Sequence, residues 1–189
     1  MEKRKEIIQA TVRLTSQLGL EGASLSRIAQ EALLTSSALN SYFPTQWHLL
    51  EAAYQEVQAD HMRALKSVLD QHAQDFSEAA LRNLYLVSTQ YWLKHENAFD
   101  FAQQYFNSSH FTEEVKSKTD ALFADLGHWF NQAMQYGLIR EIALQQLLPL
   151  LFANIVTTVR CIMETEVLVE KDHYNHAGYQ FIWHALRAG

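Results

Sequence analysis

The sequence contains few of the residues that interrupt helices. Among 189 residues there are only six glycines and two prolines. No segment of four to eight residues alternates apolar and polar side chains as a half-buried strand does. The helix-forming residues Ala, Leu, Gln and Glu are abundant instead, and the 48% apolar content excludes a disordered chain. These features predict an all-α globular protein.

Cysteine and long apolar runs are also scarce. The single Cys161 excludes an internal disulfide framework and a Cys-rich zinc site, and it is most simply a buried apolar side chain in a reducing cytoplasm. The charged start MEKRKE runs directly into an amphipathic helix, so we expect no signal peptide. The most apolar run, 147–159, is interrupted by Pro149 and Asn154 and is too short to cross a bilayer. We therefore expect a soluble cytoplasmic protein without membrane contact.

Positive charge is in short supply, and its distribution is uneven. The net charge is −6, yet residues 1–50 carry five Lys and Arg against four Glu, so the acidic excess lies in the rest of the chain. A slightly basic segment on an acidic body is compatible with a small DNA-binding domain attached to a larger domain.

The first 44 residues predict three short helices. Apolar residues recur at helical spacing over 7–18, and the glycines that follow are expected to end the first helix. Ser24 or Ser26 can cap a second helix, Thr35 can cap a third, and Pro44 disfavours helical geometry in the residue before it. The second and third helices, joined by a tight turn, form a helix-turn-helix, which would place the third in a DNA major groove.

From Trp47 onwards the predicted helices become long. They cover residues 47–72, 77–95, 98–107, 112–136, 142–166 and 172–187. Pro149 is expected to kink the fifth of these or to delay its start. The prediction is therefore about nine helices: an N-terminal helix-turn-helix head over residues 1–46 and a larger helical bundle for ligand binding and dimerisation over 47–189.

A motif over about the first 50 residues resembles the TetR family of transcriptional regulators. It consists of Gly19, the segment GASLSRIAQEA (22–32), Thr35, Leu39, Tyr42, Phe43 and Leu49–Leu50. The later helices match the family only in number, length and order. The resemblance implies a homodimer whose two heads reach successive major grooves of a pseudo-palindromic operator. It also implies that the bundle holds a small-molecule pocket and the dimer interface.

The motif departs from the family pattern at three positions. The turn that usually carries a glycine reads ALLT (32–35), Asn40 stands where an aromatic residue is frequent, and Gln46 stands where Lys is frequent. The aromatic residue and the Lys commonly touch phosphate in the family. These departures keep a second hypothesis open: a dimeric adaptor or ligand sensor with this fold whose DNA binding is weak or lost.

DNA contacts in this head would depend on neutral groups. Hydroxyls and helix N-terminal N–H groups can hold phosphate, Asn40 could pair with an adenine edge, and Ser37 or Ser41 with either kind of edge. The alternative is that these Ser and Thr residues only cap helices and form turns. The candidate DNA contacts are Lys3, Arg4, Lys5, Ser24, Ser26, Arg27, Thr35, Ser36, Ser37, Ala38, Asn40, Ser41, Tyr42 and Thr45.

Aromatic residues crowd the middle of the chain, five of them within FDFAQQYFNSSHF (99–111). Most aromatic side chains at helical spacing belong to a core, but this excess suits a mostly apolar pocket for an aromatic or hydrophobic effector. The candidate ligand contacts are Trp92, His95, Phe99, Tyr105, Phe106, His110, His128, Trp129 and Arg160.

The last two predicted helices are the most apolar ones. The resemblance assigns them to a dimeric four-helix interface, with an intramolecular core as the alternative. The candidate interface residues are Phe152, Ile155, Val159, Tyr179, Ile182, Trp183 and Leu186.

Nine histidines raise the question of an enzyme. The spacings Asp125-x-x-His128 and His173-x-x-His176 suit metal ligands on a helix, but no second acidic-x-x-His pair completes a di-metal bundle, and no catalytic motif is present. We therefore predict no catalytic residues, no metal and no cofactor, and a helical-bundle metalloenzyme is the least favoured alternative. The favoured function is a ligand-responsive dimeric transcriptional regulator, a repressor released from operator DNA by a small, mostly apolar effector.

Overall fold

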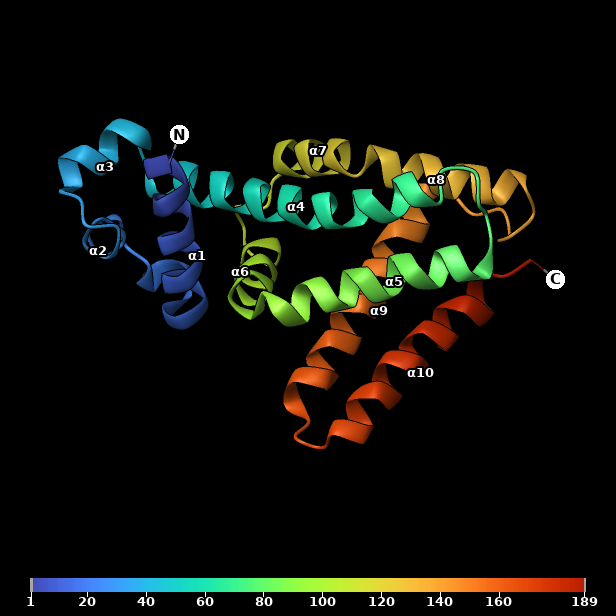
Figure 1. The fold of residues 1–189 in the computed structure, drawn as a ribbon. Helices are drawn as coiled ribbons and strands as arrows, with labels where there is room; N and C mark the ends of the chain where they lie inside the picture. The colour runs from blue at the N-terminus through green and yellow to red at the C-terminus, as the bar shows by residue number, and fades with distance from the viewer. Residues whose placement is uncertain (1, 189) are drawn as a thin grey trace. The chain divides into compact units, whose positions relative to one another are not determined.

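The computed structural model describes residues 2–188, apart from the side chain of Val169, and is built of α-helices (Figure 1). The helices are α1 (Glu2–Gly22), α2 (Leu25–Glu31), α3 (Ser36–Tyr42), α4 (Gln46–Gln71), α5 (Glu78–Lys94), α6 (Glu96–Phe106), α7 (Glu113–Leu122), α8 (Ala124–Gln135), α9 (Leu144–Glu164) and α10 (Leu168–Leu186). Within the described residues, extended pairing is limited to one isolated bridge between Ile139 and Arg187. The prediction of an all-α fold with an N-terminal helix-turn-helix is confirmed.

The main difference from the predicted helices lies between α7 and α8. The segment predicted as one helix over 112–136 is two helices, because Phe123 leaves regular helical geometry (φ −94°, ψ 13°) between α7 and α8. The Phe123 side chain is buried against the rings of His61 and Phe152, at centroid distances of 5.8 and 5.2 Å. No glycine or proline marks this interruption in the sequence, so local pattern could not predict it. Pro149 does not delay α9, which begins five residues before it.

The chain divides into two compact units. Unit 1 consists of Met1–Asp60 and His95–Leu122, and unit 2 consists of His61–Lys94 and Phe123–Gly189. The units follow contacts in space rather than the order of the chain, and α4 contributes residues to both of them. The predicted domain boundary between residues 46 and 47 stays a prediction.

The core of unit 1 joins the first helices to α6. Helix α1 packs against α2 and α6, and α2 packs against α3. Ile7 on α1, Ile28 on α2, Leu39 on α3 and Leu49 on α4 are fully buried. Burying an aliphatic side chain of this size stabilises a fold by about 1.5–3 kcal/mol. Turning any of these helices about its axis would expose its buried residue and lose that free energy, so these residues fix the rotation of the helices.

In unit 2 a polar cluster and a glycine hold three helices together. The hydroxyl of Tyr85 on α5 donates to Asn154 Oδ1 on α9 (2.8 Å) and shares a hydrogen bond with Thr158 Oγ1 (2.9 Å). Gly178 on α10 faces this cluster, and a Cβ atom there would collide with Thr158 Oγ1 and with the Tyr85 hydroxyl. The glycine therefore allows α10 to approach α5 and α9 closely.

Helix α9 is apolar enough to raise the question of a membrane. By length and composition alone, it is the one helix among the described residues that could cross a bilayer, with a mean hydropathy of 1.5 over its most apolar window. Core helices of globular proteins pass the same test. Here α9 packs against α5, α8 and α10 within unit 2.

Candidate DNA-reading surface and ligand-binding residues

The helix-turn-helix is set by two side-chain caps. The Ser24 hydroxyl accepts a hydrogen bond from the backbone N–H of Arg27 (3.4 Å) at the start of α2, and Thr35 Oγ1 accepts one from the N–H of Ala38 (3.2 Å) at the start of α3. Of the two predicted caps for α2, the structure uses Ser24, while Ser26 is exposed. Ser24 and Thr35 thus have the plain structural role of starting the two helices.

The turn between α2 and α3 contains a leucine in a conformation that favours glycine. Leu33 has φ +54°. The N–H of Leu34 donates to the carbonyl of Ala29 (2.8 Å), and the N–H of Leu33 donates to that of Gln30 (3.1 Å). This pair of bonds is the Schellman helix end, in which glycine usually occupies the left-handed position. The turn keeps the geometry that a glycine would give, although Leu33 leaves its side chain 88% exposed.

The outward face of α3 carries small polar side chains. Ser36, Ser37, Asn40 and Ser41 are exposed, while Leu39 is fully buried on the other side of the helix. The hydroxyl of Ser41 donates to the carbonyl of Ala38 (2.7 Å), and that of Ser37 shares a hydrogen bond with Thr35. Among the residues that the structure describes, none forms a hydrogen bond to the side-chain amide of Asn40. That amide can therefore donate to and accept from a partner outside the chain.

Three of the predicted cationic contacts are engaged inside the head. Lys3 Nζ donates to the carbonyl of Ala32 (3.0 Å) at the end of α2 and pairs with Glu6 (2.7 Å). The Arg4 guanidinium lies 5.2 Å from the Phe43 ring centroid. Arg27 Nη1 donates to the carbonyl of Gly22 (3.1 Å). Lys5 is exposed.

The start of α4 uses its polar residues in the same local way. Thr45 Oγ1 accepts a hydrogen bond from the N–H of His48 (3.2 Å) and contacts His48 Nδ1 (2.8 Å). Gln46, which stands where the family often has Lys, donates from Nε2 to the carbonyl of Leu20 (2.9 Å) and so ties α4 to the end of α1. Tyr42 at the end of α3 is 45% exposed.

The candidate ligand residues of unit 1 are buried, stack on other aromatic side chains or lie at the surface. Phe99 and Tyr105 are buried, and the Tyr105 ring stacks on Tyr54 at 4.8 Å. The His110 ring stacks on Trp47 at 3.3 Å. Phe106 and His95 are exposed. These residues form the aromatic packing of unit 1, which is the commoner role of aromatic side chains at helical spacing.

The candidate ligand residues of unit 2 do not share one site. Trp92 is buried and lies 4.6 Å from the ring of His61. Trp129 and His128 line an open groove at the surface. Arg160 is exposed on α9 and does not line the groove.

Sequence patterns missed His61, which is almost completely buried at 1% exposure. Its ring lies among the aromatic side chains of Tyr91, Trp92, Phe123 and Phe152, at centroid distances of 5.0, 4.6, 5.8 and 6.4 Å. Burial lowers the pKa of His61 to about 3, so the imidazole is neutral at physiological pH. The helical spacing of His61 with the buried residues Val57 and Leu65 was the available signal.

One nitrogen of His61 has a partner and the other does not. Nε2 shares a hydrogen bond with the Ser88 hydroxyl (2.8 Å), whereas Nδ1 has no partner among the residues that the structure describes. Ser88 and Phe152 also line a small enclosed cavity of about 20 Å³, whose walls are otherwise almost entirely apolar. In the interior of unit 2, the small apolar cavity thus lies next to the polar pair of His61 and Ser88.

The predicted dimer residues are mostly part of the core of unit 2. Ile155, Val159, Tyr179, Ile182 and Leu186 are each at most 6% exposed within the single chain, because they face α5 and the other helix of the α9–α10 pair. Phe152 and Trp183 are half-buried.

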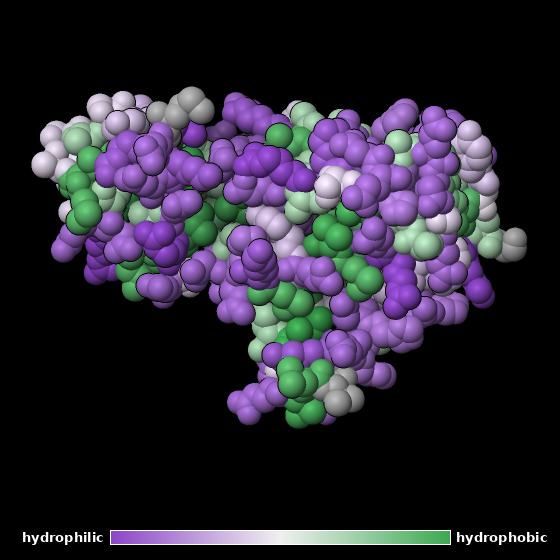
Figure 2. Space-filling view, viewed as in Figure 1, coloured by the Kyte–Doolittle hydropathy of each residue, from purple (hydrophilic) through white to green (hydrophobic). Residues whose placement is uncertain are grey.

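Other residues form the outward face of α9 and α10. On α9 the exposed residues include Leu150 (63%), Ala153 and Thr157, followed one turn later by Arg160, and on α10 they include Tyr174 (38%), Ala177 and Phe181 (70%), flanked by His173 and His184. Figure 2 shows apolar atoms gathered at the end of this hairpin, where Val167 and Leu168 are also exposed.

The two residue pairs with metal-ligand spacing, Asp125 with His128 and His173 with His176, are not part of a larger ligand cluster among the described residues. Across residues 2–188, no three His, Cys, Asp or Glu side chains form a group that could hold a metal ion. Asp125 instead pairs with Lys66, at 3.2 Å between Oδ2 and Nζ.

An all-α chain with an N-terminal helix-turn-helix defines the class of helical regulators that bind DNA, and comparison with known proteins narrows this class. Residues 7–53 match the model of the bacterial regulatory proteins of the tetR family. The HTH-type transcriptional regulator PksA of Bacillus subtilis is 42% identical over 67 residues, which cover 35% of this chain and 33% of that protein. The HTH-type transcriptional regulator BetI of Vibrio vulnificus is 26% identical over 66% of this chain and 72% of its own length.

A solved structure shows the same fold over the whole chain. It is that of a tetR family transcription regulator from Shewanella sp. PV-4, with a TM-score of 0.89 and 18% sequence identity over 99% of both chains. Residues 7–53 therefore carry the pattern of the tetR family of bacterial regulatory proteins, and the whole chain shares the fold of this solved structure. The family and these relatives are transcriptional regulators, which confirms the prediction that the chain is not an enzyme. The matched segment spans only about a third of the length of the PksA regulator.

Proposed function

We propose that the protein is a homodimeric, ligand-responsive transcriptional repressor that reads operator DNA with α3. The exposed face of α3 carries this proposal. The side chains of Ser37 and Asn40 are small, neutral hydrogen-bonding groups on a helix whose rotation is fixed by the buried Leu39. Amides bind the N6 and N7 edge of adenine, and hydroxyls bind several base edges in the major groove.

Affinity for the phosphate backbone is expected to be modest. Lys3, Arg4 and Arg27 already hold contacts within the head, so fewer free cations are available to replace the counterions of DNA. We therefore expect a shallow dependence of binding on salt. Serine hydroxyls, Thr45 and Tyr42 at the margins of the helix-turn-helix would supply neutral phosphate contacts.

Dimerisation is proposed to use the outward face of α9 and α10. Leu150 and Phe181 are large exposed apolar side chains, and Ala153 and Ala177 are small enough to let helices from a second copy approach closely. An exposed apolar face of this kind is typical of an interface between copies. A two-fold axis would present two α3 helices to a pseudo-palindromic operator, with half-sites about 34–36 Å apart.

The effector is proposed to be small and mostly apolar, and to bind inside unit 2 beside His61. The aromatic side chains around His61 support this choice. The adjoining apolar cavity has only about 20 Å³, so the effector would have to open the interior of unit 2 in order to bind. The unpartnered Nδ1 atom of His61 would give one polar contact to orient the effector. An effector that binds better to a dimer with wrongly spaced heads would release the operator in the cytoplasm.

A gel-shift assay with DNA from the promoter region of the protein's own gene tests this proposal. We expect binding by the ligand-free protein at low salt, and the variant Asn40→Ala should lose about 5- to 150-fold in affinity, which corresponds to 1–3 kcal/mol for a base contact. The matched control is Asn131→Ala, an exposed asparagine on α8. Absence of binding at low salt would instead support a dimeric adaptor or ligand sensor, the alternative that the Gln46–Leu20 contact favours.

A further inference from the structure

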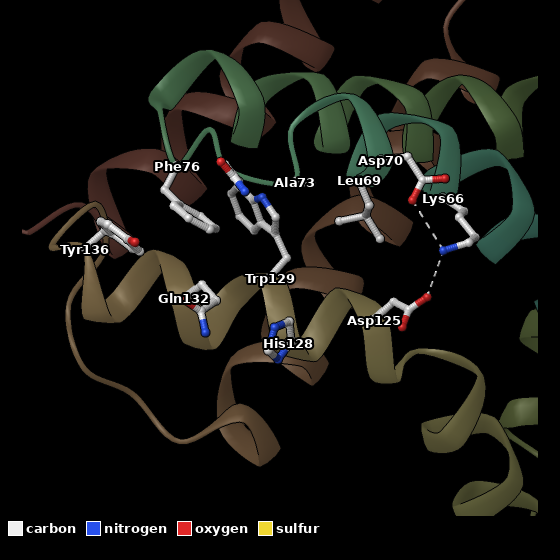
Figure 3. A pocket seen from close by; sticks show the side chains of 11 residues that line it. Lys66, Leu69, Asp70, Ala73, Phe76, Asp125, His128, Trp129, Gln132 and Tyr136 are labelled. Carbon is white, nitrogen blue, oxygen red and sulfur yellow. Dashed lines mark hydrogen bonds and ion pairs between the residues drawn. The ribbon is translucent and has the colours of Figure 1, made fainter.

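An open groove on unit 2 belongs neither to the DNA-reading surface nor to the cavity beside His61. It has a volume of about 670 Å³ and is bordered by the last turns of α4, the loop that follows them and α8 (Figure 3). This volume lies within the range of about 300–1,000 Å³ that is typical of small-molecule sites. The groove is therefore large enough for a ligand as it stands.

One end of the groove is an aromatic wall. The rings of Phe76 and Tyr136 stack at 4.8 Å with 16° between their planes, and the Trp129 ring lies 5.9 Å from Phe76. Trp129 is held in place because its Nε1–H donates to the carbonyl of His72 (3.3 Å). Tyr136 is 72% exposed, so a flat aromatic surface faces the open groove. Offset stacking on such a surface is favourable for another ring.

The other end of the groove is charged, with more negative than positive groups. Lys66 Nζ lies 3.4 Å from Asp70 Oδ1 and 3.2 Å from Asp125 Oδ2, and hydrogen bonds to Asp125 and Asp70 raise the pKa of Lys66. Two carboxylates thus share one ammonium group. All three side chains are more than half exposed, and such exposed pairs contribute little to stability. A second cation can therefore take the place of Lys66 at small cost.

We propose that this groove binds a small aromatic cation. Its ring would stack on the Phe76–Tyr136 wall beside Trp129, and its ammonium group would lie between Asp70 and Asp125. Figure 3 shows the rings and the carboxylates at opposite ends of one groove, which is the arrangement that such a ligand needs. An anion is disfavoured, because the only lysine of the groove is already shared by two carboxylates.

The site does not depend on DNA binding, so it can be tested on the free protein. Isothermal titration with three naphthalene probes that carry their head group on a flexible chain separates the possible ligand chemistries: 4-(2-naphthyl)butyltrimethylammonium, the neutral 4-(2-naphthyl)butan-1-ol and the anionic 5-(2-naphthyl)pentanoate. The chain is needed because Asp125 and Tyr136 lie about 16 Å apart along α8. We expect the cation to bind at least about tenfold more tightly than the other two.

Substitutions of the charged residues should change the affinity in opposite directions. Asp125→Asn should weaken binding of the cationic probe about three- to tenfold, and Lys66→Met should strengthen it by a similar factor, because the internal competitor is removed. Tyr136→Ala should weaken it about two- to fivefold through loss of the stacked ring. Thermal unfolding followed by circular dichroism confirms that each variant is folded.

The pair Lys116 and Asp120 on α7 provides the matched control. It has the same i,i+4 spacing, an Nζ–Oδ2 distance of 3.3 Å and similar exposure, but it does not line the groove. Lys116→Met and Asp120→Asn should leave probe binding unchanged. Equal binding of the neutral probe, preferred binding of the anion, no binding of the cation, or a loss of cation binding in Lys66→Met would each overturn the proposal.

Discussion

The exposed face of α3 and the exposed face of the α9–α10 pair differ in chemistry. The exposed face of α3 consists of hydroxyls and one amide, opposite a single buried Leu39. The exposed face of α9 and α10 carries Leu150, Phe181 and small residues such as Ala177, with Arg160 and His184 beside them, opposite an apolar core. Hydrogen-bonding groups suit the polar edges of DNA bases, and apolar groups suit a second protein surface. We therefore expect the face of α3 to contact DNA and the face of α9 and α10 to contact a second copy of the chain.

The largest expected effect comes from placing a charge on the apolar face. Phe181→Glu should weaken dimerisation by at least about 100-fold, because an exposed apolar anchor would become a buried unpaired carboxylate at the interface. Sedimentation velocity over a concentration series measures this change. The control is Phe106→Glu, which changes a phenylalanine of unit 1 that is 53% exposed and should leave dimerisation unchanged. A dimer that survives Phe181→Glu unchanged would remove the assignment of this face.

The second largest expected effect concerns the close packing of α10 against α5 and α9 at Gly178. Gly178→Ala should destabilise the protein by about 2–3 kcal/mol, because the added methyl group collides with Thr158 and the Tyr85 hydroxyl. Urea unfolding measures the difference. Gly127→Ala on α8 is the control, since its Cβ would meet only the end of the Leu144 side chain at 3.3 Å. That control should be neutral or slightly stabilising, because alanine favours a helix more than glycine does.

Acid should expose the difference between the buried and the exposed histidines. His61 has a folded pKa of about 3, below the ordinary value of about 6.5, so it contributes to stability fully above pH 6.5 and loses this contribution as the pH falls toward 3. The loss is at most about 1.4 kcal/mol per pH unit, or about 2 kcal/mol at pH 5. Urea unfolding at pH 7 and pH 5 measures it. His61→Leu should remove this part of the pH dependence, and His48→Leu, which changes an exposed histidine of the head, should retain it.

The smallest expected effect lies in the turn of the head. Leu33→Gly should stabilise the protein by about 0.5–1 kcal/mol, because the left-handed conformation strains a leucine but not a glycine. Thermal unfolding measures the shift. Gln9→Gly is a control of opposite sign, since Gln9 is exposed in the regular part of α1, where glycine costs about 1 kcal/mol. A destabilised Leu33→Gly variant would show that the exposed leucine has a contact that outweighs the strain.

The parts of the site that the sequence predicted are local ones. Ser24 and Thr35 cap their helices through hydrogen bonds to residues three positions later, and the face that exposes Asn40 follows from helical periodicity around Leu39. The Leu33 turn was recognised as a departure from the family, but the Schellman geometry that it retains depends on backbone hydrogen bonds that no residue type in the turn marks.

The parts that the sequence did not predict are set by distant residues. His61 is buried because rings from α5, α8 and α9 gather around it, and Lys66 meets Asp125 across 59 positions of the chain. Five of the predicted dimer residues turned inward because α5 and the α9–α10 pair bury the same apolar stripes.

The sequence by itself determined the helical class and the helix-turn-helix, because caps, turns and helical periodicity act between neighbours in the chain. The resemblance to the tetR family came from the motif over about the first 50 residues. Only the tertiary structure decided which side of each long helix faces outward. A stripe of apolar side chains predicts that one side of a helix is buried. It does not predict whether the surface that buries it belongs to the same chain or to another. The groove between Asp125 and Tyr136 exists for the same reason, since its walls meet only after α4 and α8 have packed.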